Sequence, residues 1–425
     1  MKNDTAFQMA ASNIRFGQGI TREVGMDLID LKTSRTLVVI DPALIDLSIG
    51  ETVIESLNSN KIEYEVFSEI QIEPTNHSFQ AAIECALEGN FDSFVAVGGG
   101  STIDTAKAAN LYSTYPAEFF TYVNAPIGDG HAVPGLLKPL IAIPTTAGTG
   151  SETTGVAIFD YIEQKVKTGI AHRYMKPTLG IIDSDNTKTM PAAVAASTGL
   201  DVLSHALESY TAIPFTQRPL PARPLERPGY QGANPLSDIW AINALELMAT
   251  FLPRAVADPS DEEARANMML AATIAGIGFG NAGVHLPHAM AYPVAGMVQN
   301  FSPDGYAADH PMVPHGMSVI LNTPAVVRFT APSNPTKHLL AAKALGADIT
   351  NASPEDAGEI LASRIIHFMK KLNMPNGLAA LGYSEADIPS LVAGTIPQQR
   401  ITKLSPIPAG EKQLTTLFQN SLTLW

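Results

Sequence analysis

The chain has few cysteines and few charged residues, and acidic side chains outnumber basic ones. A single cysteine, Cys85, among 425 residues excludes an internal disulfide bond and is typical of a reducing compartment. Charged residues make up 16% of the chain and hydrophobic residues 45%, which indicates a globular rather than a disordered protein. The net charge of −14 argues against nucleic acid or an anionic membrane surface as a partner.

Long apolar runs and targeting segments are also missing. No run reaches the roughly 20 residues that a bilayer-spanning helix needs, so we expect no membrane span. The first residues show neither the apolar core of a signal peptide nor the Arg-rich, acid-poor character of a transit peptide. These absences predict a cytoplasmic location, or the mitochondrial matrix if a leader has been removed.

The pattern of apolar residues changes near residue 190. Before it, short runs such as TLVVID, FVAV and PLIAIPTT alternate with helical segments, which predicts βαβ units and a mainly parallel sheet. Beyond it, long helical patterns such as AAVAASTGLDVLSHALESY dominate. Because 425 residues are too many for one ordinary core, we predict an α/β domain over residues 1–190 and a helical domain over 191–425.

A stretch rich in proline and arginine, PFTQRPLPARPLERPGYQGANP, interrupts the helical part between Ala212 and Pro235. So many prolines cannot form a helix, and we predict an ordered loop on one edge of the helical domain. Long loops in compact domains are often functional, so a role in a substrate pocket or a subunit contact stays open.

Glycine and hydroxyl residues follow two of the predicted strands. The first loop precedes a helix that Ser101 is placed to cap, and glycine amides at a helix N-terminus favour a phosphate. Two such loops at adjacent strand ends would line a crevice for a diphosphate, although a simple tight turn remains the alternative for the first. The loop residues are Gly98, Gly99, Gly100 and Ser101, and then Thr145, Thr146 and Thr149.

Asp41 ends the predicted strand TLVVID. A carboxylate at this place could accept hydrogen bonds from a ribose, which would favour NAD over its 2′-phosphorylated relative. The alternative is that Asp41 only caps the helix that follows Pro42.

Histidines and an aspartate suggest a metal site in the helical part. Asp201 and His205 lie four residues apart on a predicted helix, so they share one face. A carboxylate with three imidazoles suits a first-row divalent ion and leaves a position open for a substrate oxygen. The alternative is that this pair only forms a mutual hydrogen bond. Spacing alone does not choose among the later histidines, which are His285, His288, His310 and His315.

The sequence resembles the iron-containing (group III) alcohol dehydrogenase family. The matching motifs are GGGSTIDTAK, PTTAGTGSE, GLDVLSHALESY, HAMAYPVAG and VPHG, and the match runs from about residue 10 to the end. The resemblance implies a Rossmann-like α/β domain followed by an all-α domain, the architecture shared with dehydroquinate synthase. Segments such as SETTGVAIFDY and GIGFGNAGVHLPHAMAYP are most similar to the members that transfer hydride between hydroxy and oxo acids.

The resemblance also implies site residues and cofactors. The implied metal ligands are Asp201, His205, His288 and His315. The family name implies Fe(II), whereas equilibrium affinity would favour Zn(II). The implied NAD-binding residues are Asp41, Thr75, Gly98, Gly99, Gly100, Ser101, Asp104, Thr145, Thr146, Thr149 and Lys167.

One position departs from the family pattern. Many members carry a second histidine four residues after the one that matches His288, and this chain has Tyr292 there. An ordinary tyrosine, with a pKa of about 10, is a poor base at neutral pH, so the proton path must differ. His285 is our candidate for the relay.

These expectations predict an oxidoreductase whose bound NAD carries hydride from a hydroxy acid to an oxo acid. The resemblance suggests 4-hydroxybutyrate and 2-oxoglutarate, giving succinate semialdehyde and 2-hydroxyglutarate. The alternative is a dehydrogenase of primary alcohols or 4-hydroxybutyrate that uses free NAD. A lyase like dehydroquinate synthase fits less well because its site uses a Glu with two His, and a non-enzymatic nucleotide-binding protein would leave the metal ligands without a role.

Two carboxylate substrates require a cation, and a homo-oligomer, a dimer or larger, is expected from the family. The candidate cations are Arg173, Arg218, Arg223 and Arg227.

Overall fold

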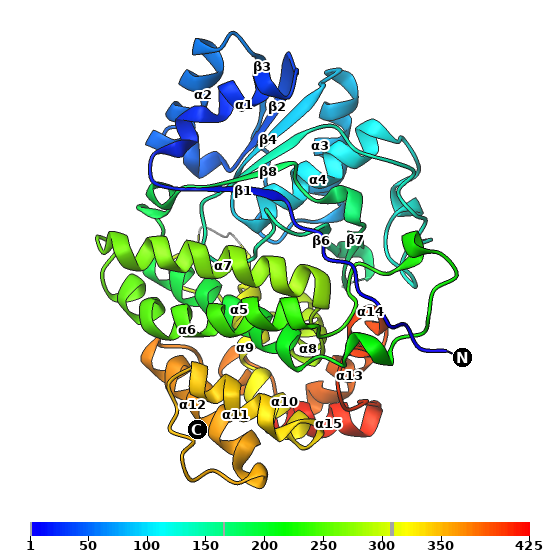
Figure 1. Cartoon of the computed structure of the whole chain (residues 1–425), viewed down its shortest axis with the longest axis vertical. Helices are drawn as coiled ribbons and strands as arrows, with labels where there is room; N and C mark the ends of the chain where they lie inside the picture. Colours follow the sequence, from blue (N-terminus) through cyan, green and yellow to red (C-terminus); the bar gives the residue numbers. More distant parts are fainter. Residues whose placement is uncertain (1, 165, 307–309) are drawn as a thin grey trace. The chain divides into compact units, whose positions relative to one another are not determined.

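The structure, a computed structural model, describes residues 2–164, 166–306 and 310–425. It divides into two compact units. The α/β unit is Ala10–Met190, and the helical unit is Pro191–Trp425 together with the residues before Ala10 (Figure 1).

A six-stranded parallel sheet forms the centre of the α/β unit. Its strand order is β1-β8-β5-β4-β2-β3, and every neighbouring pair is parallel. The strands are β1 Asn13–Phe16, β2 Arg35–Ile40, β3 Glu63–Phe67, β4 Ser93–Gly98, β5 Leu140–Pro144 and β8 Leu179–Ile182. The predicted Rossmann-like parallel sheet is confirmed.

Helices cover both faces of this sheet (Figure 1). In β2, Val38 and Ile40 belong to the core shared with α1 and α2, whereas Leu37 and Val39 belong to the core shared with α3 and α4. A strand covered on both faces needs a continuous apolar run, which is the pattern that the sequence shows. The helices are α1 Val24–Asp30, α2 Ser48–Ser59, α3 Asn76–Glu88 and α4 Gly100–Thr114.

The apolar run VAIFD does not join the main sheet. It forms β6 Val156–Tyr161, which pairs antiparallel with β7 Val166–Ala171 as a separate hairpin. A short apolar run identifies a strand but not its partner, because the choice of partner depends on contacts distant in sequence.

The helical unit is arranged around α5 (Ala192–Thr211). From Gly199 to Thr211 every residue of α5 is buried, and α6, α7 and α9 pack against it. Figure 1 shows α5, α6 and α7 side by side. The other helices are α6 Pro235–Ala257, α7 Glu262–Ala282, α8 Leu286–Gly296, α9 His315–Ile320, α10 Thr323–Thr330, α11 Pro335–Ala344, α12 Ala357–Lys371, α13 Ile388–Thr395, α14 Gln399–Thr402 and α15 Glu411–Ser421.

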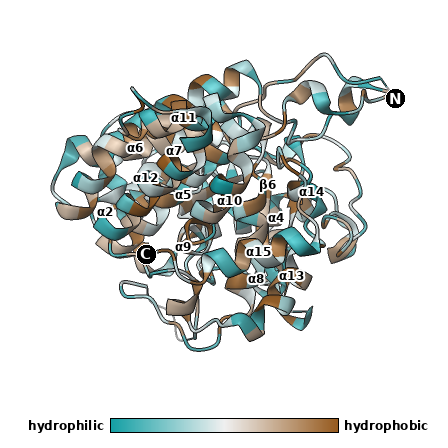
Figure 2. Cartoon of the chain, turned by 90° about the horizontal axis from the view of Figure 1, so that it is seen from below, coloured by the Kyte–Doolittle hydropathy of each residue, from teal (hydrophilic) through white to brown (hydrophobic). Residues whose placement is uncertain are grey.

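The outer helices of this unit, such as α12 and α15, carry both hydrophilic and hydrophobic residues (Figure 2). By length and composition alone, α6 is apolar enough to cross a membrane, and so are α7 and α8 if taken together across their 104° bend. Core helices of soluble proteins meet the same criterion, and α6 packs against both α5 and α7.

The proline-rich segment between α5 and α6 contains two short 3₁₀ turns and no α-helix, as predicted. Two of its arginines bind the carboxylate of Asp4: Arg218 at 2.6 Å and Arg227 at 2.9 Å. These two candidate cations are therefore engaged in an ion cluster that fastens the loop to the start of the chain.

Candidate metal centre

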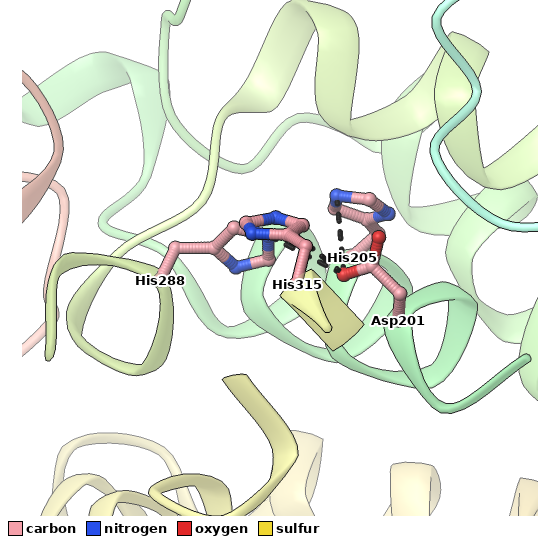
Figure 3. A group of neighbouring side chains, drawn as sticks. All are labelled: Asp201, His205, His288 and His315. Carbon is pink, nitrogen blue, oxygen red and sulfur yellow. Dashed lines mark ion pairs between the residues drawn. The ribbon is translucent and has the colours of Figure 1, made fainter. Parts of the chain in front are cut away.

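Four side chains of the helical unit meet at one point (Figure 3). One ligand atom from each of Asp201, His205, His288 and His315 lies within 4.8 Å of the others. Asp201 Oδ1 is 3.7 Å from His205 Nε2, 3.6 Å from His288 Nε2 and 4.0 Å from His315 Nε2. Donors that each lie about 2 Å from a shared ion are roughly 3–4 Å from one another, so the spacing fits one ion.

The central helix supplies two of the four residues. Asp201 and His205 project from α5, and their side chains are 2% and 5% exposed. A carboxylate taken out of water in a helix buried on all sides must meet a positive partner, or folding would carry a penalty of several kcal/mol. Burial of this carboxylate among imidazoles therefore indicates a cation site rather than a solvated face.

A glycine allows the fourth residue to approach. α9 begins at His315, and a Cβ atom on Gly316 would lie only 2.1 Å from the carbonyl oxygen of Ser197 in α5. The amide of Met317 also donates to Ser197 Oγ at 3.1 Å. The first turn of α9 can therefore lie directly against α5, which brings His315 to Asp201.

Glu208, one turn beyond His205, orients His288. Its Oε1 accepts a hydrogen bond from His288 Nδ1 at 2.6 Å, and its Oε2 accepts one from the amide of His285 at 2.6 Å. Burial alone would raise the pKa of Glu208, but the His288 imidazole lowers it below the usual value. A carboxylate can only accept, so Nδ1 carries the proton and Nε2 faces Asp201.

One aromatic contact and one accessible side further characterise the cluster. The His205 ring stacks on Phe279, with ring centroids 3.9 Å apart and planes 8° apart. His288 Nε2 is buried and has no hydrogen-bond partner among the residues that the structure describes. The side chain of His315 is 25% exposed, whereas that of His288 is 4% exposed, so the cluster is accessible from the His315 side.

The two predicted relay residues lie outside this group of four. His285 Nε2 is 3.1 Å from Thr211 Oγ1, and burial lowers the pKa of His285 to about 4. Such a ring is neutral at pH 7 and is a weaker base than an exposed histidine. Tyr292 lies one turn after His288 in α8, and its buried ring belongs to a core cluster with Phe279. The relay role of each stays a prediction.

The two predicted phosphate loops lie side by side in the α/β unit. Gly98 at the end of β4 is opposite Pro144 at the end of β5, and the amide of Thr145 donates to the Gly98 carbonyl at 3.1 Å. A Cβ atom on Gly100 would lie 2.6 Å from Thr149 Cγ2. Larger residues would separate the loops, so the glycines are needed for this contact.

The start of α4 differs from the prediction. The helix begins at Gly100 with Gly99 as its N-cap, so Ser101 lies inside the first turn and does not cap the helix. Ser101 Oγ instead accepts a hydrogen bond from the amide of Glu73 at 3.3 Å. A Cβ atom on Gly99 would lie 3.3 Å from Thr146 Oγ1, so the first amides of α4, which no side chain of the described residues caps, adjoin the second loop.

Asp41 and Thr75 both act as helix caps. Asp41 Oδ1 accepts from the amide of Ala43 at 2.9 Å, and Thr75 Oγ1 accepts from the amide of Ser78 at 3.1 Å. The capping alternative for Asp41 is therefore observed. A contact of either residue with a nucleotide stays a prediction.

Asp104 and Lys167 make several contacts within the α/β unit. Asp104 accepts from Ser151 Oγ at 2.5 Å and from a backbone amide of β6 at 2.9 Å. Lys167 Nζ lies 2.7 Å from Glu73 and 3.1 Å from Asp160. Burial alone would lower the pKa of Lys167, but the two carboxylates raise it. Asp104 therefore connects α4 to the second loop and to β6, whereas Lys167 connects β7 to β6 and to Glu73. The predicted contact of each with NAD stays a prediction.

Sequence reasoning missed Glu208 and Phe279. Glu208 follows His205 by three positions, a helical spacing that places the two on one side of α5. That spacing was the available signal for Glu208. Nothing local distinguishes Phe279 from the other apolar residues of α7.

The chain matches two models of one protein family. Residues 11–184 match the model for iron-containing alcohol dehydrogenase, and residues 229–422 match the C-terminal model of the Fe-containing alcohol dehydrogenase family. These spans cover more than half of the chain. The protein belongs to the iron-containing alcohol dehydrogenase family, which confirms the resemblance.

Individual relatives show which members of the family this chain is similar to. The mitochondrial hydroxyacid-oxoacid transhydrogenase of Rattus norvegicus is 55% identical over 424 residues, which cover 99% of this chain and 91% of that protein. The solved 1,3-propanediol oxidoreductase has a TM-score of 0.85 and 27% identity, covering 98% of this chain and 100% of that one. Sulfoacetaldehyde reductase from Bifidobacterium kashiwanohense, solved in complex with NAD+, has a TM-score of 0.81 and 25% identity, covering 99% and 100%.

Proposed function

We propose that the protein is an enzyme that transfers hydride from a hydroxy acid to an oxo acid. The observation that carries this proposal is the 55% identity, over 99% of the chain, to a hydroxyacid-oxoacid transhydrogenase. The cluster of one carboxylate and three imidazoles supports it, because such a set suits a divalent ion with a position open for a substrate oxygen.

We assign a divalent metal to Asp201, His205, His288 and His315 because their donor chemistry fits one. The family name favours Fe(II), and Zn(II) is the alternative, since both accept imidazole and carboxylate ligands. When bound, such an ion would polarise the hydroxyl or carbonyl oxygen of the substrate. Glu208 would hold His288 in the orientation that this binding requires.

The paired loops at the ends of β4 and β5 would hold the diphosphate of NAD. The first amides of α4 supply donors and positive potential, and the glycines let a phosphate approach the backbone. The NAD+ complex of the sulfoacetaldehyde reductase supports this cofactor. Asp41 Oδ1 caps the following turn, and we assign the other carboxylate oxygen, Oδ2, to a ribose hydroxyl.

The reaction that we propose has two halves. A hydroxy acid such as 4-hydroxybutyrate gives a hydride to NAD and loses a proton, leaving succinate semialdehyde. An oxo acid such as 2-oxoglutarate then takes up the hydride and a proton, leaving 2-hydroxyglutarate. His285 and Tyr292 are our candidates for carrying the proton, and Tyr292→Phe should change the pH dependence of the rate if the phenol takes part.

One experiment tests the proposal directly. Purified protein is incubated with 4-hydroxybutyrate and 2-oxoglutarate without added NAD, and 2-hydroxyglutarate is measured. We expect product to form at the same rate with and without free NAD, because the cofactor stays bound. Product that forms only when free NAD is supplied would overturn the transhydrogenase proposal in favour of a plain dehydrogenase.

The relatives also bear on location and assembly. The hydroxyacid-oxoacid transhydrogenases of Rattus norvegicus and Homo sapiens are named as mitochondrial, which supports the matrix alternative for this chain, whereas the cytoplasmic location stays a prediction. A dimer or larger homo-oligomer, and the expectation of neither nucleic acid nor membrane partners, also remain predictions. Size-exclusion chromatography with light scattering would measure the oligomeric state of the purified protein.

A further inference from the structure

A cavity lined by basic residues lies at the amino ends of two strands in the α/β unit. Its volume is about 160 Å³, and its lining includes Lys107, Lys138, Arg173 and Lys176. None of its lining residues, all within the described part of the chain, is acidic. Four basic residues around one cavity are unexpected in a protein whose net charge is −14. One of them, Lys107, forms an ion pair with Asp104 at 3.4 Å.

The cavity lies at the amino ends of the strands, whereas the phosphate loops lie at their carboxyl ends. Leu140 begins β5 and Thr178 directly precedes β8, and both line the cavity. The loops that we assign to NAD follow the carboxyl ends of β4 and β5. A five-residue strand is roughly 15 Å long, so the two places are distinct.

The wall of this cavity is held firmly. Asn110 is buried in α4, and its side chain donates to the Lys138 carbonyl at 2.8 Å and accepts from the Lys138 amide at 3.2 Å. The Thr178 amide donates to the Leu140 carbonyl at 2.8 Å, and Lys176 Nζ donates to the Ala10 carbonyl at 2.5 Å. Fixed backbone segments present these cations, as in a preformed site.

The cations also repel one another. Burial, together with the charges of Lys107 and Arg173, lowers the pKa of Lys176 to about 8. Burial also lowers the pKa of Lys138, although the nearby Asp92 opposes the effect. Asp92 itself accepts hydrogen bonds from the amides of Ser34 and Arg35 and is not among the residues that line the cavity. A bound anion would relieve this repulsion.

We propose that this cavity binds a small oxyanion with two or more negative charges, such as a phosphate group or a dicarboxylate. The site is additional to the proposed NAD and metal sites and does not depend on the proposed reaction. Lys107 also connects the cavity to the second phosphate loop, because its Nζ donates to Ser151 Oγ at 2.6 Å.

The test is a calorimetric titration of the full chain with inorganic phosphate at constant ionic strength. Saturating NAD is present so that phosphate cannot occupy the nucleotide loops. We expect saturable binding that Lys138→Ala weakens roughly tenfold, since a charge-assisted contact is lost. Lys188→Ala is the matched control, because this substitution removes the same charge from the same unit. Lys188 is exposed and pairs with Asp185.

A second readout locates the anion. Lys176, with its lowered pKa, should react readily with an amine acylating reagent, and phosphate should protect it in a mass-spectrometric footprint. Malonate in a parallel titration separates recognition of a carboxylate from that of a phosphate. Binding of either anion that Lys138→Ala weakens supports the site. Binding equal in Lys138→Ala and Lys188→Ala, or no saturable binding of either anion, would overturn it.

Discussion

The metal cluster and the phosphate loops are assembled from residues at very different separations along the chain. Asp201 and His315 are 114 positions apart (315 − 201), and three helices bring the four ligands together. In the loops, Gly98 to Ser101 are consecutive, and the second loop follows the neighbouring strand. The cluster therefore depends on helix packing, whereas the loops depend on local backbone conformation.

Replacing a metal ligand should have the largest effect. We expect His288→Ala to weaken metal binding and hydride transfer by more than about 100-fold, because changes outside the ligand shell alone cost 10–100-fold. Elemental analysis and the two-acid assay measure the loss. His367→Ala is the control, since His367 is exposed in α12 and outside the cluster. Full metal content in His288→Ala would refute the assignment.

Glu208→Gln tests whether the buried carboxylate orients His288. An amide keeps the size of the side chain but places an N–H₂ group towards either the His288 ring or the His285 amide, where a carboxylate oxygen now accepts. We expect metal affinity to fall roughly 10–100-fold with the fold retained. Chelator competition measures this affinity, and Glu246→Gln on the exposed side of α6 is the control. An unchanged affinity would show that Glu208 has only a structural role.

Gly100→Ala tests the contact between the two phosphate loops. The added methyl group would lie 2.6 Å from Thr149 Cγ2, so the loops must separate, at a cost of about 1–3 kcal/mol. We expect about tenfold weaker NADH binding in a fluorescence titration, with metal content unchanged. Gly229→Ala is the control because a Cβ atom there would meet nothing within 4 Å. Loss of metal together with NADH affinity would contradict the independence of the two sites.

The smallest effect concerns the ion cluster of Asp4. The hydrogen bond from Arg227 lowers the pKa of Asp4 to about 2. Because this value is below that of the unfolded chain, the stabilisation is complete above about pH 4 and is lost as the pH falls towards 2. We expect Asp4→Asn to lower the free energy of unfolding by roughly 1 kcal/mol at pH 7.

Denaturant unfolding of both forms across this range checks the sign of the pH effect. The gap between wild type and Asp4→Asn should narrow as the pH falls from 4 to 2. A gap that is constant over this range would show that the pKa of Asp4 is the same in the native and unfolded states. Asp46→Asn is a suitable control, since Asp46 is an exposed aspartate of the same chain.

The sequence predicted the alternation of strands and helices, the change of pattern near residue 190 and the glycine loops, because each leaves a periodic or local signal. It did not predict the hairpin of β6 with β7, the N-cap at Gly99 or the ion cluster at Asp4. Strand partners and ion pairs depend on residues far apart in the chain, and a cap depends on where the preceding strand ends.

The sequence by itself therefore determined an α/β part, a helical part, and residue types suited to binding a phosphate and a metal. The spacing of the histidines left open which of them meet Asp201, and the tertiary structure brings His205, His288 and His315 to it. The tertiary structure also decided that Glu208 contacts one of them and that four basic residues line one cavity. Periodicity fixes which face of an element a side chain occupies, whereas the packing of elements fixes what that face meets.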